Sequence, residues 1–192
     1  MKTLKLILLL FSLSFISCEK EIDDQPTNEE NRFVPTDVFV KIKGGYTIDK
    51  VFKFINSFDH EVENINSLKF TSSLSPDSLQ YVLDYLNAKP YTNDGNVWFV
   101  NGYLHYQTNQ ITIFPRLFNI KNTTYQEDWL NSMKVLKLKE DTISQTAGCI
   151  IYFHVPEGEE RLWESIFKKY EFVEWVQLNY YSDIILLNNK NR

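Results

Sequence analysis

The first clear pattern in the chain is an alternation of apolar and polar residues followed by a helical repeat. The alternation over Asp37–Lys43 is typical of a half-buried strand, and Gly44-Gly45 ends it. After Thr47, apolar residues recur every three or four positions as far as Phe58, which predicts an amphipathic helix. A second strand over Ile65–Ser72 would complete a strand–helix–strand unit.

The same order of elements returns near the end of the chain. A strand is predicted over Cys149–Val155, and Pro156-Glu157-Gly158 follows it as a turn. An amphipathic helix is predicted over Glu159–Tyr170 and a strand over Phe172–Leu178, with a further strand over Asp183–Leu187. The first and last units therefore look like partners in one sheet.

Residues 73–147 separate the two units and have elements of their own. A helix is predicted from Ser75-Pro76-Asp77 to Lys89-Pro90, because proline and an acidic residue favour the first turn. Asn101-Gly102 separates two short β-prone segments, Val97–Val100 and Tyr103–Tyr106, which predicts a two-residue hairpin. A third strand over Ile111–Phe118 follows, and the capping-box spacing of Thr124-Tyr125-Gln126-Glu127 predicts another helix.

Together these elements predict an α+β domain with a ferredoxin-like sandwich of antiparallel sheet and helices, interrupted by a helix and β-meander insertion. The last unit is also similar to the end of subtilisin-type propeptides and their stand-alone inhibitor relatives. The residues that carry this resemblance are Val155–Glu160, Phe167–Tyr170 and Val173–Tyr180, and Val38–Gly45 loosely matches the family's opening strand. The resemblance implies inhibition of subtilisin-type proteases, with the tail Tyr181–Arg192 offered to the protease cleft. The long insertion departs from the family pattern.

The amino-terminal segment resembles a bacterial lipoprotein signal. Lys2 and Lys5 precede an apolar run over Leu6–Ile16, and Ser17 stands directly before Cys18. This run is about half of the ~20 residues that a membrane-spanning helix needs. The resemblance implies that residues 1–17 are a signal peptide and that Cys18 carries a lipid which anchors the chain to a membrane. The alternative is an ordinary signal peptide with an incidental cysteine.

Residues 18–35 are acidic and polar, with almost no apolar residues that could form a packed face. We interpret them as a flexible tether, and residues 36–192 as a single α+β domain. Acidic residues behind the lipidated cysteine also resemble the export signal of some surface lipoproteins, although a simple solubilising linker would have the same composition. We therefore expect an outer-membrane lipoprotein on the periplasmic or cell-surface face.

Charge and cysteine content exclude several classes of function. The leader holds two of the 20 basic and none of the 25 acidic residues, so the mature chain has a net charge of −7. A nucleic-acid partner would need a basic surface, so none is expected. Without Cys18, only Cys149 remains, which excludes an intramolecular disulfide and fits a small buried residue.

No catalytic constellation is evident along the sequence. His60, His105 and His154 lie in separate elements without a second metal ligand at helical or loop spacing. No serine has the spacing of a nucleophile elbow, and no cofactor motif is present. We therefore expect no catalytic residues, no metal and no cofactor.

Aromatic residues make up 15% of the chain and concentrate in predicted strands. Core and cross-strand packing explains most of them, but some must point away from the helices. An exposed row of rings would bind sugar rings or a peptide. The candidate binding residues are Trp98, Tyr103, Tyr106, Trp175 and Tyr180. The sequence thus favours a non-enzymatic, lipid-anchored binding module for a protein, peptide or glycan, and the alternative is the protease inhibitor.

Overall fold

The computed structural model describes residues 32–144 and 146–181, which belong to one compact unit. Cys18, the predicted signal peptide, most of the predicted tether and the predicted strand Asp183–Leu187 lie outside the described residues. The described chain forms helices and two antiparallel sheets, so the predicted α+β class is confirmed. None of the described helices is long and apolar enough to span a membrane.

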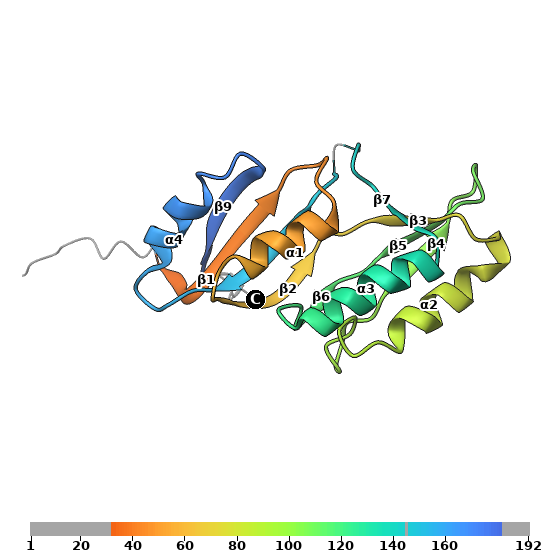
Figure 1. Cartoon of the computed structure of the whole chain (residues 1–192), viewed down its shortest axis with the longest axis horizontal. Helices are drawn as coiled ribbons and strands as arrows, with labels where there is room; N and C mark the ends of the chain where they lie inside the picture. Colours follow the sequence, from red (N-terminus) through yellow and green to blue (C-terminus); the bar gives the residue numbers. More distant parts are fainter. Residues whose placement is uncertain (1–31, 145, 182–192) are drawn as a thin grey trace, which may run out of the picture. The chain divides into compact units, whose positions relative to one another are not determined.

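The first sheet contains both predicted strand–helix–strand units. Its strand order is β6-β2-β8-β1-β9, and the inner order β2-β8-β1-β9 is that of a ferredoxin-like sandwich (Figure 1). The elements of the two units are β1 (Phe33–Ile42), α1 (Ile48–Asn56), β2 (Glu61–Asn66), β8 (Cys149–His154), α4 (Glu160–Phe167) and β9 (Val173–Tyr180). Because β1 lies between β8 and β9, residues more than 100 positions apart become direct neighbours.

The insertion builds a second sheet with the order β4-β5-β3-β7. Its elements are β3 (Phe70–Ser72), a short 3-10 helix η2 (Pro76–Ser78), α2 (Leu79–Asn87), β4 (Asn101–Leu104), β5 (Ile111–Phe114), β6 (Leu117–Phe118), α3 (Thr123–Val135) and β7 (Leu138–Glu140). The strand predicted over Ile65–Ser72 is in fact two strands, since the chain leaves the first sheet after β2 and enters the second at β3. Strand β6 returns to the edge of the first sheet beside β2.

The predicted Asn101-Gly102 hairpin turn is wrong. Both residues lie in β4 and pair with Phe114 and Ile113 of β5. A Cβ atom on Gly102 would lie 2.5 Å from the Thr112 carbonyl oxygen, so the glycine permits close approach of two strands. The turn lies further on, where the Asn109 N–H donates to the His105 carbonyl oxygen at 2.8 Å.

The segment Val97–Val100, predicted as a strand of that hairpin, is a loop. The Asp94 carboxylate fixes its course, because its Oδ1 accepts the backbone N–H groups of Asn96, Val97 and Trp98 at 2.9 Å each. These hydrogen bonds, with Trp98 first among them, hold the pKa of Asp94 below its ordinary value. Similarly, the helix predicted from a capping box at Thr124 is capped earlier, since the Asn122 side chain accepts the Thr124 N–H.

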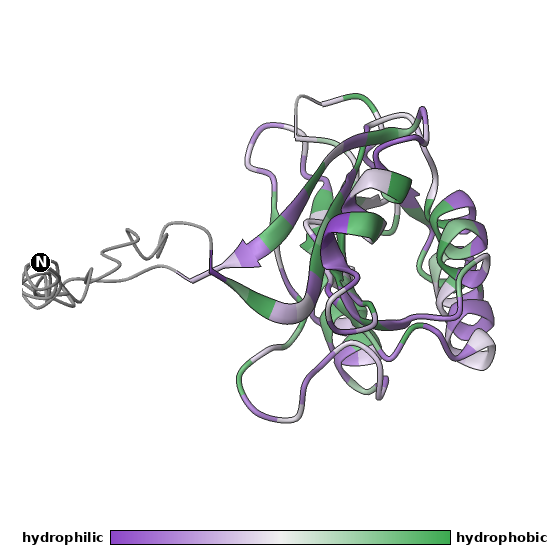
Figure 2. Cartoon of the chain, turned by 90° about the vertical axis from the view of Figure 1, so that its left-hand side faces the viewer, coloured by the Kyte–Doolittle hydropathy of each residue, from purple (hydrophilic) through white to green (hydrophobic). Residues whose placement is uncertain are grey.

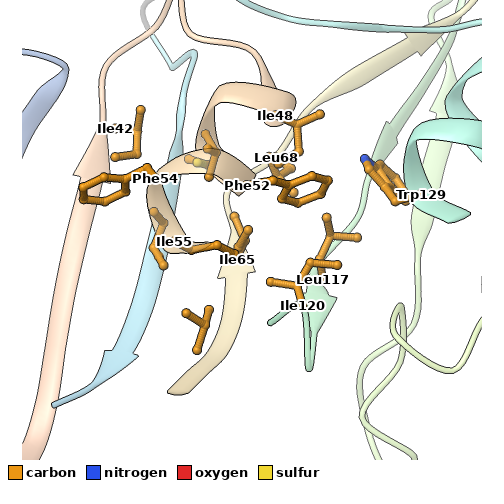
Figure 3. Packing of buried hydrophobic residues seen from close by; sticks show 14 of the residues in the cluster. Ile42, Ile48, Phe52, Phe54, Ile55, Ile65, Leu68, Leu117, Ile120 and Trp129 are labelled. Atoms are coloured by element: carbon orange, nitrogen blue, oxygen red, sulfur yellow. The ribbon is translucent and has the colours of Figure 1, made fainter. Parts of the chain in front are cut away.

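One continuous hydrophobic core joins the two sheets. Ile42 and Phe54 lie on one side of α1, and Ile48 and Phe52 lie on the other side, toward Trp129 of α3 (Figure 3). Trp129 is fully buried and packs edge-on against Phe70 of β3 at 5.4 Å between ring centroids. The insertion is therefore packed as part of the domain core.

Glu140, the last residue of β7, caps helix α1 from the second sheet. Its Oε2 accepts the Ile48 N–H at 2.8 Å, and Thr47 offers no side-chain cap of its own. Burial raises the pKa of Glu140 from 4.5 to about 7, although the Ile48 N–H opposes the shift. The folded state thus binds this proton more tightly than the unfolded chain does.

Glu140→Gln is expected to remove a pH-dependent loss of stability. A raised carboxyl pKa means that the Glu140 contribution to the free energy of unfolding falls as pH rises from about 4.5 to about 7. The variant keeps an oxygen acceptor for Ile48, so it should gain about 3 kcal/mol relative to the wild type between pH 4.5 and pH 8. Urea unfolding across this range measures the difference, and a constant difference would contradict the assignment.

Candidate functional site

The first sheet has one face against helices α1 and α4 and one face without a helix among the described residues (Figure 1). Along β1, Val38, Val40 and Ile42 are buried on the helix side, while Phe39 and Lys41 are half-buried on the other side. The same alternation of hydrophobic and hydrophilic positions is visible along the long strands (Figure 2). We call the second side the open face, and its side chains are available for recognition.

Asp37 is the centre of a polar network on the open face, although it is only 4% exposed. Its Oδ2 accepts the hydroxyl of Tyr152 and, at 2.8 Å, the Nδ2–H of Asn179. Its Oδ1 lies 3.1 Å from the Nδ1 of His154, which donates to it in the tautomer that carries a proton on Nδ1. Burial and the nearby Asp37 carboxylate raise the pKa of the Tyr152 hydroxyl. Three adjacent strands, β1, β8 and β9, thus contribute to one hydrogen-bonded network.

His154 is held between two carboxylates. Its Nδ1 faces Asp37, and its Nε2 lies 3.5 Å from Glu63 Oε2. The pairing of β2 with β8 shifts register between Val62 and Asn64, so Glu63 is an extra residue in β2. Such a bulge re-aims a side chain, and here the result is that Glu63 reaches the imidazole. Asp37 and Glu63 therefore flank the imidazole of His154, with the shorter contact on the Asp37 side.

A strained backbone position supports Asp37. Thr36 has a φ of 71°, which is unfavourable for a β-branched residue. The buried carboxylate of Glu160 compensates, because its Oε1 accepts the Thr36 N–H at 2.8 Å and the Gly158 N–H at 3.1 Å. Burial would raise the pKa of Glu160, but these backbone hydrogen bonds hold it below the ordinary value. Glu160 in α4 is thus a positioning residue for the network in β1.

Glu160→Ala is expected to lower the free energy of unfolding by about 2 kcal/mol, since two backbone N–H groups lose a charged acceptor. Glu160→Gln keeps an acceptor and should lose about half as much. Because the pKa of Glu160 is lowered, its contribution is present at neutral pH and declines as acid protonates it. Chemical denaturation of both variants at pH 7 tests this order of stability, and equal losses would refute it.

A polar groove of about 880 Å³ begins at His154. Its lining includes Glu61 and Glu63 from β2, Asp94 from the loop before β4, and Arg116 and Lys121 on either side of β6. The ammonium group of Lys121 already has hydrogen-bond partners, because its Nζ donates to the carbonyl oxygens of Ile55 and Phe58 at 3.2 and 2.5 Å. The groove therefore combines Glu63 beside His154 with further charged groups of both signs, namely Glu61, Asp94, Arg116 and Lys121.

This groove is suited to hydrogen bonding and charge recognition. Its lining contains no serine, threonine or cysteine that could act as a nucleophile beside His154. Within residues 32–144 and 146–181, no group of three or more His, Cys, Asp or Glu side chains is placed to hold a metal ion. Burial raises the pKa of the Cys149 thiol, which lies inside the core as expected from its sequence context.

The five predicted binding aromatics lie in two separate regions. Trp175 and Tyr180 belong to β9 of the first sheet, and Tyr180 packs edge-on against Phe33. Tyr103 is in β4 of the second sheet, whereas Trp98 and Tyr106 lie outside strands. The expectation that all lie on strands is therefore wrong for Trp98 and Tyr106, and their role in binding stays a prediction.

The other two histidines pack against aromatic rings. The ring of His60 lies edge-on to Trp163 with 4.1 Å between centroids, and His105 stacks on Tyr106 at 5.6 Å. His154 has no partner at helical or loop spacing in the sequence. The missing partner, Asp37, could have been found from the ferredoxin-like strand order, which places the two strands side by side.

Comparison of the chain with protein families, with curated proteins and with solved structures found no match.

Proposed function

We propose that this chain is a lipid-anchored protein of the cell envelope whose α+β domain binds a ligand in the groove beside His154 without catalysing a reaction. Cys18 would be the anchor, on the outer membrane and on either its periplasmic or its surface side. The single observation that supports binding is the position of His154, which contacts Asp37, is flanked by Glu63 and lines the groove. Groups that are ordered before a ligand arrives lose less entropy on binding.

The anchor is tested on protein purified from its native membrane. Mass spectrometry of the amino-terminal peptide should show a chain that begins at Cys18 and carries acyl groups. Three acyl chains on Cys18 would hold the protein in the membrane, because each buried methylene contributes about 0.8 kcal/mol. Cys18→Ala should move the protein from the membrane fraction to the soluble fraction. An unmodified Cys18 in membrane-purified protein would refute the anchor.

The binding site is tested with His154→Gln, and the matched control is His105→Gln, in the turn after β4 and outside the groove. Calorimetry of the full chain with two probes, triglycine and the neutral trisaccharide cellotriose, should detect saturable binding of at least one of them. We expect His154→Gln to weaken that binding at least tenfold and His105→Gln to leave it within twofold. Binding that is unaffected by His154→Gln, or chemical turnover of a bound probe, would overturn the proposal.

A second candidate is the inhibitor of subtilisin-type proteases that the sequence resemblance implies. The ferredoxin-like strand order and the open face support it, because that face carries the exposed Trp175 opposite Lys41, and Phe39 packed against Tyr152, for contact with a partner. A panel of subtilisin-like proteases should lose activity at micromolar concentrations of the full chain. Unchanged activity at high micromolar concentration would exclude this function.

A further inference from the structure

Arg116 carries a charge without an ionic partner in the described structure. It lies between β5 and β6, and its guanidinium carbon is 4.2 Å from the Trp98 ring centroid and 5.9 Å from that of Phe118. Its Nε is buried without a hydrogen-bond partner, and so is the Nε1 of Trp98. Such unsatisfied donors are costly, which suggests that a ligand contributes the missing acceptor.

Neighbouring cations are engaged, in contrast to Arg116. Lys69 pairs with Asp141 at 2.9 Å, and Lys89 pairs with Asp128 at 2.9 Å. The aromatic contacts hold the guanidinium plane in place without using its hydrogen-bonding edge. Arg116 is therefore a preformed site for an anion.

Two cavities meet at Arg116. One is the groove of about 880 Å³ that begins at His154, and the other, of about 440 Å³, is lined by Trp98, Ser67 and Thr146 among others. The pairing of Ile65 with Leu117 places Arg116 level with Asn66, three residues along β2 from Glu63. Three residues of strand span about 10 Å, so the backbone positions of Glu63 and Arg116 are separated by about the length of a tripeptide.

We propose that the groove binds a short peptide with free ends, its carboxylate on Arg116 and its ammonium group beside Glu61 and Glu63. A carboxylate suits Arg116 because the guanidinium fork binds two coplanar oxygens. A phosphate dianion suits it less, because Lys69 is already neutralised by Asp141 and the acidic groups of the groove repel a second negative charge. This inference rests on the proposed binding function and names the ligand of the same groove.

The test compares triglycine, its carboxyl-terminal amide and its N-acetyl form, each titrated into the full chain. We expect the amide to bind at least tenfold more weakly than triglycine and the N-acetyl form about threefold more weakly. Arg116→Gln should make triglycine and its amide bind equally, because the variant lacks the partner of the carboxylate. Arg116→Lys should give an intermediate result, since it keeps the charge and loses the fork.

The matched control is Arg161→Gln, because Arg161 also lies over an aromatic ring, that of Phe33, but contacts Glu164 and is outside the groove. It should leave all three affinities unchanged. Equal affinity of the wild type for triglycine and its amide, or tighter binding of inorganic phosphate, would overturn the inference. If cellotriose binds in a His154-dependent way and triglycine does not, the peptide inference is wrong and the binding function stands. If neither binds, both are wrong.

Discussion

Replacing Gly148 with alanine is expected to lower the free energy of unfolding by at least about 4 kcal/mol. Gly148 has a φ of +89°, and a Cβ atom there would lie 2.1 Å from the Ile42 carbonyl oxygen and 2.9 Å from the Lys43 carbonyl carbon. Neither backbone atom can move without disturbing the pairing of Ile42 with Cys149 at the start of β8. Because β8 carries Tyr152 and His154, the functional network should be lost with the strand.

Gly158 provides a matched control for this substitution. Its φ is +85°, close to that of Gly148, but a Cβ atom there would have nothing within 4 Å. Gly158→Ala should therefore cost only the backbone strain, about 1–2 kcal/mol. Denaturant unfolding of both variants separates close contact from backbone strain. Equal losses would mean that the approach of Gly148 to Ile42 is not what constrains this position.

Asp37→Ala is expected to lower the free energy of unfolding by about 3 kcal/mol, the largest effect that we expect at the candidate site. The substitution removes the acceptor of the Tyr152 hydroxyl, of Asn179 and of His154 Nδ1. Tyr152 and Asn179 are half-buried, so water replaces the lost acceptor only in part. His154 would also lose its fixed orientation, and ligand affinity should fall with it.

Two further variants serve as controls for Asp37→Ala: a conservative substitution of Asp37 itself, and the removal of an acidic side chain elsewhere in the sheet. Asp37→Asn keeps the side-chain shape and one acceptor oxygen, so its loss should be about half that of Asp37→Ala. Glu174 is an exposed acidic residue at the register shift in β9, and Glu174→Ala should stay within about 0.5 kcal/mol of the wild type. A loss for Asp37→Ala as small as that for Glu174→Ala would show that the network does not stabilise the domain.

The two strand–helix–strand units could be predicted from the sequence because each combines two simple periodicities. The alternation over Asp37–Lys43 and the helical repeat after Thr47 correspond to β1 and α1, and the last unit corresponds to β8, α4 and β9. Two such units are also what the ferredoxin-like order of the first sheet requires. That order places Asp37 opposite His154, although 117 residues separate them in the chain.

The insertion was harder to predict because tertiary contacts override its local signals. Asn101-Gly102 has the sequence of a hairpin turn, yet Gly102 is required in β4 by the approach of Thr112. The switch from β2 to β3 occurs where Ser67 adopts a φ of 59°, which no apolar pattern indicates. Likewise, the importance of Arg116 follows from an unsatisfied Nε and a stacked indole, and these are properties of the folded chain.

The most direct test of the binding groove is the NMR signal of the His154 imidazole in the full chain during titration with triglycine. We predict that the ring signals of His154 shift in a saturable way, together with the Nε1–H signal of Trp98 and with one dissociation constant. The ring signals of His105, which follows β4 and packs against Tyr103 and Tyr106, should not shift. Shifts of His105 equal to those of His154, or no shift of either residue, would contradict a binding site between His154 and Arg116.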